Sequence, residues 1–241
     1  MGTHGSFGLR FDTEIQDQIS GLYIPSPGAQ HKMLIALDTE TTGVPLWSYP
    51  DPFCPKQVVA WPRLVSVAWQ VVTPGVTPAP EELVARPDGF VIPTGASNVH
   101  GISTARATEV GKPLVTILDR LLQVLNTCQD EDEVVVIAAY NYEFDYGVLV
   151  AECTRLGHPL GARLGTVQWQ CVMRLVKQAG NHDRYLNLKR AVELYAPNHR
   201  SSRFHSASGD VTALVALMLA RALTHGQRRR HQEKRGVSAV G

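Results

Sequence analysis

Two acidic residues near the start of the chain could together bind a metal ion. Asp38 and Glu40 belong to the segment Asp-Thr-Glu-Thr-Thr-Gly at 38–43, directly after the apolar run 33–37. Side chains alternate between the faces of a strand, so both carboxylates point the same way, about 7 Å apart, and repel by roughly 2 kcal/mol. No lysine or arginine lies between residues 33 and 55 to balance them. A divalent cation such as Mg²⁺ or Mn²⁺, which prefers oxygen ligands, would do so.

Two later segments add further groups of the same chemistry. Asp145 follows the apolar run 134–139 and begins an expected helix. It therefore lies at the carboxyl end of a buried strand, where α/β sheets place their ligands, although an acid there also stabilises a helix N-terminus. His205 and Asp210 are separated by serines, an alanine and a glycine. This composition is typical of a loop entering a helix, so the imidazole and the carboxylate can face one site.

Taken together in this order, the three segments resemble the motifs of the DEDDh 3′→5′ exonuclease family, which includes the proofreading ε subunit of bacterial DNA polymerase III. The resemblance covers about residues 33–223. It lies in Asp-Thr-Glu-Thr-Thr-Gly, in Asn141-x-x-Phe144-Asp145 and in His205-x-Ala207-x-x-Asp210. The segment Val-His-Gly-Ile at 99–102 is similar to the His-Gly-Ile segment of the family. The chain departs from the family at Tyr140, where histidine is common, and in its proline-rich segment 44–62.

The resemblance implies a ribonuclease H-like fold and a two-metal hydrolysis that releases nucleoside 5′-monophosphates. It implies two Mg²⁺ ions, with Mn²⁺ as a substitute. Asp38, Glu40 and Asp210 would hold one ion, and Asp38 would also reach the second ion, which Asp145 supports. His205 would be the general base, a role that its near-neutral pKa suits. The residues expected to grip the terminal nucleotide are Thr41, Thr42, His100 and Asn141.

The substrate implied by the resemblance is the 3′ end of DNA, single-stranded or frayed. Thr39 and the pair Thr41-Thr42 are more similar to the DNA-directed branch of the family than to its RNA-directed branches. An exoribonuclease that trims RNA ends or short oligoribonucleotides is the alternative. A nucleic-acid-binding module without catalysis is a second alternative, but it would be expected to lack one of the four acids or the histidine. We expect any polymerase partner, in DNA replication or repair, to be a separate chain.

The apolar pattern predicts the elements that must position these residues. Apolar runs predict buried strands, and a stripe of leucines with the spacing of helical turns predicts a helix that begins at a proline. Three strands precede the first long helix, and strand and helix alternate afterwards, which predicts a mixed sheet flanked by helices in a single domain. The expected strands are 33–37, 64–72, 89–92 and 134–139, and the expected helices are 113–125, 144–156, 186–195 and 208–223.

Composition and charge set the wider frame. The 241 residues are 44% hydrophobic and 19% charged, as in ordinary globular proteins. We expect a poorly ordered extension at 1–32, an exonuclease domain at 33–225 and a basic tail at 226–241. Five basic residues and Glu233 give the tail a charge of +4, so the remainder carries −3 of the net +1. The four widely spaced cysteines and the lack of a membrane-spanning or signal segment favour a cytoplasmic protein without membrane association.

Overall fold

The computed structural model describes most of the expected exonuclease domain. The described residues are 32–46, 50–72, 78–127, 134–199 and 204–220. All of the expected extension except Lys32, and the whole basic tail, lie outside the described residues. Among the described residues, no helix is both long and apolar enough to cross a membrane.

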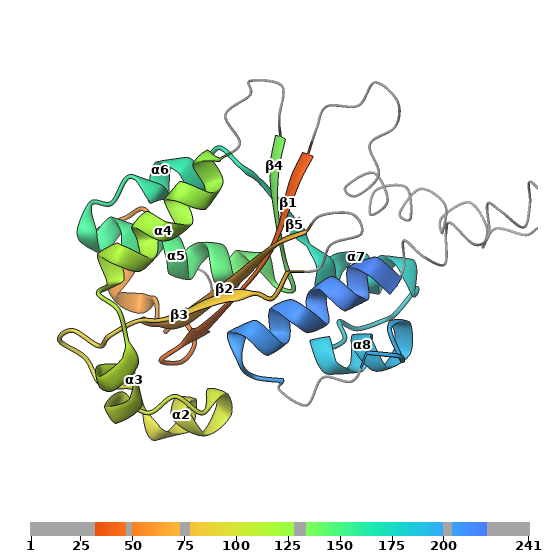
Figure 1. Cartoon of the computed structure of the whole chain (residues 1–241), viewed down its shortest axis with the longest axis horizontal. Helices are drawn as coiled ribbons and strands as arrows, with labels where there is room; N and C mark the ends of the chain where they lie inside the picture. The colour runs from red at the N-terminus through yellow and green to blue at the C-terminus, as the bar shows by residue number, and fades with distance from the viewer. Residues whose placement is uncertain (1–31, 47–49, 73–77, 128–133, 200–203, 221–241) are drawn as a thin grey trace, which may run out of the picture.

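One five-stranded mixed sheet forms the centre of the molecule, with the strand order β3-β2-β1-β4-β5 (Figure 1). β1 pairs antiparallel with β2 and parallel with β4, while β2–β3 is antiparallel and β4–β5 is parallel. This arrangement confirms the predicted mixed sheet. The strands are β1 (Lys32–Thr41), β2 (Leu64–Val72), β3 (Glu81–Val84), β4 (Val134–Ala139) and β5 (Gln168–Cys171).

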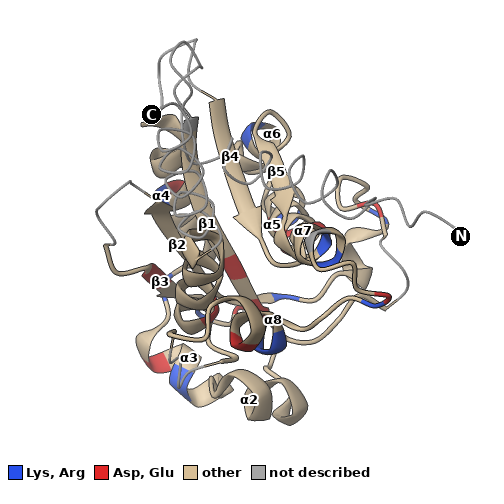
Figure 2. Ribbon diagram, turned by 90° about the vertical axis from the view of Figure 1, so that its right-hand side faces the viewer, with Lys and Arg blue, Asp and Glu red and all other residues tan. Residues whose placement is uncertain are grey.

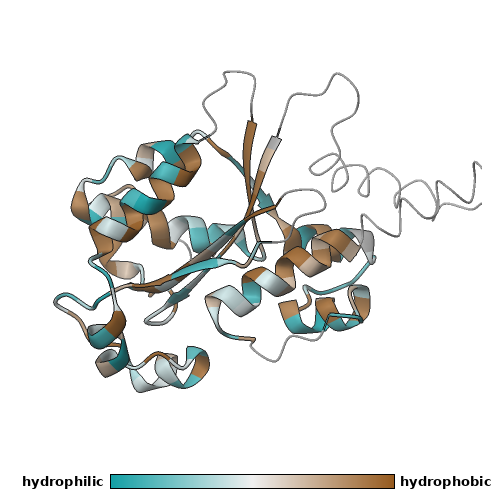
Figure 3. Ribbon diagram, in the orientation of Figure 1, coloured by the Kyte–Doolittle hydropathy of each residue, from teal (hydrophilic) through white to brown (hydrophobic). Residues whose placement is uncertain are grey.

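Helices cover both faces of the sheet, which explains why the central strands are apolar runs without polar alternation. Ile35 and Leu37 of β1 face one layer of helices, whereas Leu34 and Ala36 face the other. Figure 3 shows the central strands largely in brown and the helices with mixed faces. The first layer consists of α4 (Leu114–Asn126), α5 (Tyr142–Leu156) and α6 (Leu160–Leu164); the second consists of α7 (Val172–Ala179), α8 (Leu188–Tyr195) and a C-terminal helix described over 207–220.

A small third group of elements closes the end of the sheet near β2 and β3. The helices α2 (Thr94–His100) and α3 (Thr104–Val110) pack around Val65, Ile92 and Ala107. A single 3-10 turn, η1 (Val58–Ala60), lies in the proline-rich segment between β1 and β2.

The predicted strand at 89–92 is wrong. The third strand is β3, which ends at Val84, and residues 89–92 have no regular structure. Phe90 and Ile92 instead pack against the α2–α3 group, which accounts for the apolar residues that suggested a strand. The elements α2, α3, α6, β5 and α7 were not predicted. The other three strands and the helices near 114–126, 142–156, 188–195 and 207–220 agree with the prediction.

Candidate active site

Three of the expected acids meet on one face of β1. Carboxylate oxygens of Asp38, Glu40 and Asp210 lie within 4.8 Å of one another. Asp38 and Glu40 are two residues apart on a strand and share a face, as their spacing predicted. Asp210 comes from the first turn of the C-terminal helix, which packs across Ala68, the residue paired with Asp38 on β2. Packing of that helix on the sheet therefore brings the third motif to the first.

Asp145 joins the site through Thr39, the residue between the two strand acids. The backbone N–H of Thr39 donates to Asp145 Oδ1 at 3.0 Å, and the Thr39 hydroxyl donates to the same oxygen at 2.8 Å. Asp145 lies in the first turn of α5 and is only 4% exposed. These two bonds fix the helix start against β1, 106 residues away in sequence. Sequence reasoning did not find this role of Thr39, although its position between Asp38 and Glu40 was a usable signal.

The four carboxylates disfavour one another's ionisation. Burial, followed by the charges of Asp145, Asp210 and Glu40, raises the pKa of Asp38 well above its usual value. Burial and the same kind of repulsion raise the pKa of Glu40 to about 8. Burial raises the pKa of Asp145 to about 7 against the opposing effect of the Thr39 hydrogen bonds, and burial also raises the pKa of Asp210. Burial acts on all four acids, and nearby like charge adds to its effect on Asp38, Glu40 and Asp145.

This donor set fits hard divalent cations. All of its ligand atoms are carboxylate oxygens, the kind that Mg²⁺ and Mn²⁺ prefer. Among the described residues, no lysine or arginine forms an ion pair with any of the four acids. Figure 2 shows acidic residues within the central sheet, whereas the basic residues lie mainly on helices and connecting segments. A cation would relieve the repulsion that the protein itself leaves unbalanced.

The third motif forms a tight turn that presents His205 to solvent. His205 has φ +67, a left-handed conformation that is uncommon outside glycine and worth a functional explanation. Its backbone N–H donates to both carboxylate oxygens of Asp210, at 3.3 Å each. Ser206 begins the following helix, with its hydroxyl accepting from the Gly209 N–H and its carbonyl from the Asp210 N–H. The imidazole is thus exposed beside an acid of the cluster.

The expected nucleotide-gripping residues border the end of β1. The Thr41 hydroxyl donates to the Gly43 carbonyl at 2.6 Å, and the Thr42 hydroxyl accepts from the Arg63 N–H at 2.9 Å, so both support the turn after β1. His100 is buried, and its Nδ1 accepts from the Ile102 N–H. Burial lowers the pKa of His100, against the opposing effect of a hydrogen bond to the backbone of Thr41.

Asn141 is half-buried and immediately precedes α5, where its side chain makes no capping bond to the helix. Its carbonyl accepts from the Phe144 N–H, so the residue belongs to the turn that leads into Asp145. The side chain of Asn141 therefore lies at the start of the helix that carries the second motif.

A buried acid two turns further along α5 holds this helix against the sheet. Glu152 is fully buried, and its Oε1 accepts from Arg63 Nε and from the Leu64 N–H at 2.9 Å each. Arg155 forms an ion pair with Glu152 at 3.2 Å, and it donates to the Val58 and Trp61 carbonyls. Because these groups lie on α5, β2 and the segment between β1 and β2, they fix the orientation of the helix that presents Asp145.

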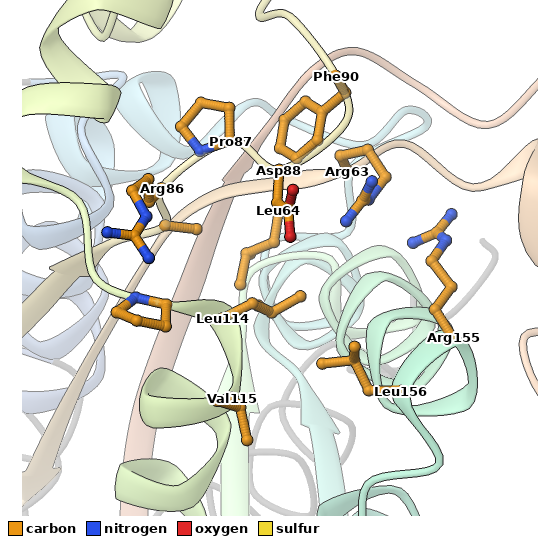
Figure 4. A pocket seen from close by; sticks show the side chains of 12 residues that line it. Arg63, Leu64, Arg86, Pro87, Asp88, Phe90, Leu114, Val115, Arg155 and Leu156 are labelled. Carbon is orange, nitrogen blue, oxygen red and sulfur yellow. The ribbon is translucent and has the colours of Figure 1, made fainter.

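Arg63 and Arg155 also border a cavity of about 530 Å³. Figure 4 shows their guanidinium groups pointing toward one another, with Arg63 beneath the ring of Phe90. The rest of the lining comes from Leu64 of β2, the segment 85–90 after β3, residues 113–115 at the start of α4 and Leu156 of α5. None of the four clustered acids lines this cavity, so it is separate from the candidate metal site.

Comparisons with known proteins relate this fold to exonucleases. No protein-family model matches the sequence, and no curated protein matches it. E. coli exonuclease I, solved as a complex with single-stranded DNA, matches with a TM-score of 0.59 and 18% identity over 85% of this chain and 43% of its own. Exonuclease I from Methylocaldum szegediense gives a TM-score of 0.56 and 19% identity over 81% of this chain and 41% of its own.

Exonuclease X, solved in complex with 5′-overhanging duplex DNA, matches with a TM-score of 0.51 and 20% identity. That match covers 80% of this chain and 93% of exonuclease X, whereas the chain spans less than half the length of the exonuclease I chains. The chain therefore has the ribonuclease H-like fold of exonucleases I and X.

Proposed function

We propose that the protein is a metal-dependent 3′→5′ exonuclease of the DEDDh type that acts on single-stranded or frayed DNA and releases nucleoside 5′-monophosphates. The observation that carries this proposal is the convergence of Asp38, Glu40 and Asp210 within 4.8 Å, with Asp145 joined to the same strand by Thr39. Residues from three distant segments meet there in a fold that two kinds of exonuclease share.

The four acids have separate tasks in this proposal. Asp38, Glu40 and Asp210 would hold one cation, and Asp38 would also reach a second, which Asp145 would support. Such cations supply positive charge against the scissile phosphate and make a water molecule more acidic. The hydrogen bonds from Thr39 keep Asp145 oriented. The acids therefore fix where the phosphate can bind.

His205 is the general base of the proposed reaction. Its exposed imidazole stands beside Asp210, where it can accept a proton from the attacking water. Asn141 at the start of α5 and His100 are the residues whose side chains are proposed to orient the terminal nucleotide. The backbone turn that Thr41 and Thr42 stabilise would border the same nucleotide.

DNA is the proposed substrate because exonucleases I and X were solved with DNA bound. In addition, Thr39, Thr41 and Thr42 resemble the threonines in the DNA-directed branch of the DEDDh family. The test uses one sequence as single-stranded DNA and as RNA, labelled at either end, with Mg²⁺ or Mn²⁺. A ladder that shortens stepwise from the 5′-labelled strand, together with immediate mononucleotide release from the 3′-labelled strand, is the expected result. EDTA should abolish it.

Two controls make the assay decisive. Circular single-stranded DNA has no end, so its cleavage would identify an endonuclease and contradict the proposal. Asp38→Asn keeps the shape of the side chain and removes its charge, and it should lower kcat by at least about 10²–10³-fold, as loss of a charge-stabilising group does. Faster release from RNA than from DNA would favour the exoribonuclease.

A further inference from the structure

A fifth acid, Glu82, lies on the edge strand and faces the same site. Glu82 of β3 pairs with Ala68 of β2, and Ala68 pairs with Asp38 of β1. Residues directly opposite one another on neighbouring strands point to the same face, so Glu82 and Asp38 share a face of the sheet. Only the methyl group of Ala68 stands between them in this row. The misplaced third strand had hidden this relation from the sequence.

Glu82 is bonded to the helix that carries Asp210. The hydroxyl of Ser208 donates to Glu82 Oε2 at 2.5 Å. Ser208 precedes Asp210 by two residues and lies in the same first helical turn, which Ser206 begins. The bond thus joins the turn containing the third motif to the strand two positions away from β1.

The charge of Glu82 also acts on the acid cluster. The charge of Glu82 contributes to the raised pKa of both Asp38 and Glu40. Its neighbour Glu81 points to the opposite face and forms a double hydrogen bond with Arg120. Within the described residues, Glu82 has no such basic partner, and its hydrogen bond is to Ser208.

We propose that Glu82 is a positioning residue that holds Ser208, and through it Asp210, in the place where Asp210 can share a cation with Asp38 and Glu40. This role rests on the proposed function, because it takes Asp210 as a metal ligand. The packing of the C-terminal helix through Val211 and Leu214 brings the helix to the sheet, and the bond to Glu82 sets the position of its first turn.

Four variants separate the hydrogen bond from the charge. Glu82→Ala removes both, Glu82→Gln removes the charge and keeps an acceptor oxygen, and Ser208→Ala removes the donor and keeps the charge. The double variant with both alanines tests whether the two residues act together. Glu81→Ala is the matched control, because it removes an acid and an ion pair from the same strand on the face away from the cluster.

The first readout is the affinity for Mn²⁺ alone, measured by titration calorimetry on the full-length protein. Glu82→Ala and Ser208→Ala should each weaken it by about three- to tenfold, as loss of one partly exposed hydrogen bond to a charged group does. The double variant should bind Mn²⁺ no more weakly than either single variant does. Glu82→Gln should stay within about twofold of wild type, and Glu81→Ala should not differ from it.

The second readout is steady-state cleavage of single-stranded DNA. The same two alanine variants should lower kcat by a similar factor and leave KM for DNA unchanged, whereas a general loss of stability would alter the melting temperature without this split. Equal Mn²⁺ affinity in wild type and Glu82→Ala would overturn the inference. It would also be overturned if Glu82→Gln weakened Mn²⁺ binding as much as Glu82→Ala while Ser208→Ala bound Mn²⁺ like the wild type. Only the charge of Glu82 would then matter.

The two proposals can fail separately. If the wild type binds Mn²⁺ and cleaves neither DNA nor RNA, the exonuclease proposal fails. The Mn²⁺ affinities of the variants still test the role of Glu82. If the wild type cleaves DNA and all variants bind Mn²⁺ equally, only the role of Glu82 fails. A wild type that binds no Mn²⁺ would contradict both.

Discussion

Removing one site carboxylate should stabilise the metal-free protein at neutral and basic pH. Glu40→Gln is the informative change, because the amide is nearly isosteric and cannot ionise. Glu40 has its pKa raised from 4.5 to about 8 by burial and by the charges of Asp210 and Asp145. The folded state therefore binds this proton more tightly than the unfolded state does. This tighter binding of the proton contributes to the free energy of unfolding. The contribution is fully present below pH 4.5 and is lost as the pH rises to about 8.

The size of the effect follows from this difference in pKa. A difference of about 3.5 at about 1.36 kcal/mol for each pKa unit sets an upper limit near 5 kcal/mol. Asp210 and Asp145 contribute to the rise, and their own protonation relieves it. We therefore expect about 2–3 kcal/mol at pH 8 for a carboxylate that titrates together with its neighbours.

The assay is urea unfolding in EDTA at intervals between pH 5 and pH 9. Glu40→Gln should be more stable than wild type at pH 8 by this amount, and the difference should shrink toward pH 5. Comparing the two proteins cancels the titration of every group that does not interact with Glu40. Added Mg²⁺ should reverse the order at pH 8, because the ion binds the ionised carboxylates of the wild type and so stabilises its folded state.

The control is Glu81→Gln, whose acid pairs with Arg120 at the surface. It should change stability by less than about 1 kcal/mol at every pH, as exposed ion pairs do. Parallel curves for wild type and Glu40→Gln between pH 5 and pH 8 would refute the electrostatic description of the site. Failure of Mg²⁺ to stabilise the wild type more than Glu40→Gln would refute its role as a cation ligand.

Three further changes test how the site is held together. Thr39→Val removes the hydroxyl that binds Asp145 and should destabilise the fold by about 1–3 kcal/mol while lowering kcat, measured by unfolding and by cleavage rate. Gly147→Ala would place a Cβ 1.9 Å from a ring carbon of Trp61, so α5 must shift; we expect a loss of about 1–3 kcal/mol in the free energy of unfolding and slower cleavage. His205→Ala should lower kcat by about 10²–10⁴-fold and remove the inflection near neutral pH from the rate profile.

The first two changes have matched controls, and the last two have defined contrary results. Thr108→Val removes an exposed hydroxyl that donates to the Thr104 carbonyl, and it should leave kcat unchanged. Gly95 lies in a helix, and a Cβ added there has no atom within 4 Å. Because alanine favours a helix over glycine, Gly95→Ala should raise the free energy of unfolding by up to about 1 kcal/mol. If Gly147→Ala were as stable as the wild type, the ring of Trp61 would be able to move away from the added Cβ at little cost in free energy. An unchanged pH profile of His205→Ala would transfer the role of general base to another group.

The amino-acid sequence predicted the parts of this protein that local patterns determine. The apolar runs within β1, β2 and β4 can only be buried between two layers, and the leucine stripe of α4 can only cover such a sheet. The strand alternation predicted that Asp38 and Glu40 share a face, and the structure places their carboxylates together. The catalytic roles of these residues stay predictions until activity is measured.

The sheet edges depended on tertiary structure. β3 has the sequence Glu-Glu-Leu-Val, and β5 has Gln-Trp-Gln-Cys, so neither shows an apolar run that marks a strand. These segments are strands because β2 and β4 offer them backbone partners. The more apolar segment 89–92 was mistaken for a strand because local hydropathy does not show which surface an apolar side chain will meet.

The meeting of the motifs was likewise decided only in three dimensions. Nothing local indicates that Thr39 will hold Asp145, or that Ser208 will reach Glu82 from 126 residues away. These contacts arise because helices pack on both faces of one sheet and bring their first turns to β1 and β3. Sequence determined which chemical groups are available and the strand face on which the first pair lies, and packing determined which of the distant groups meet.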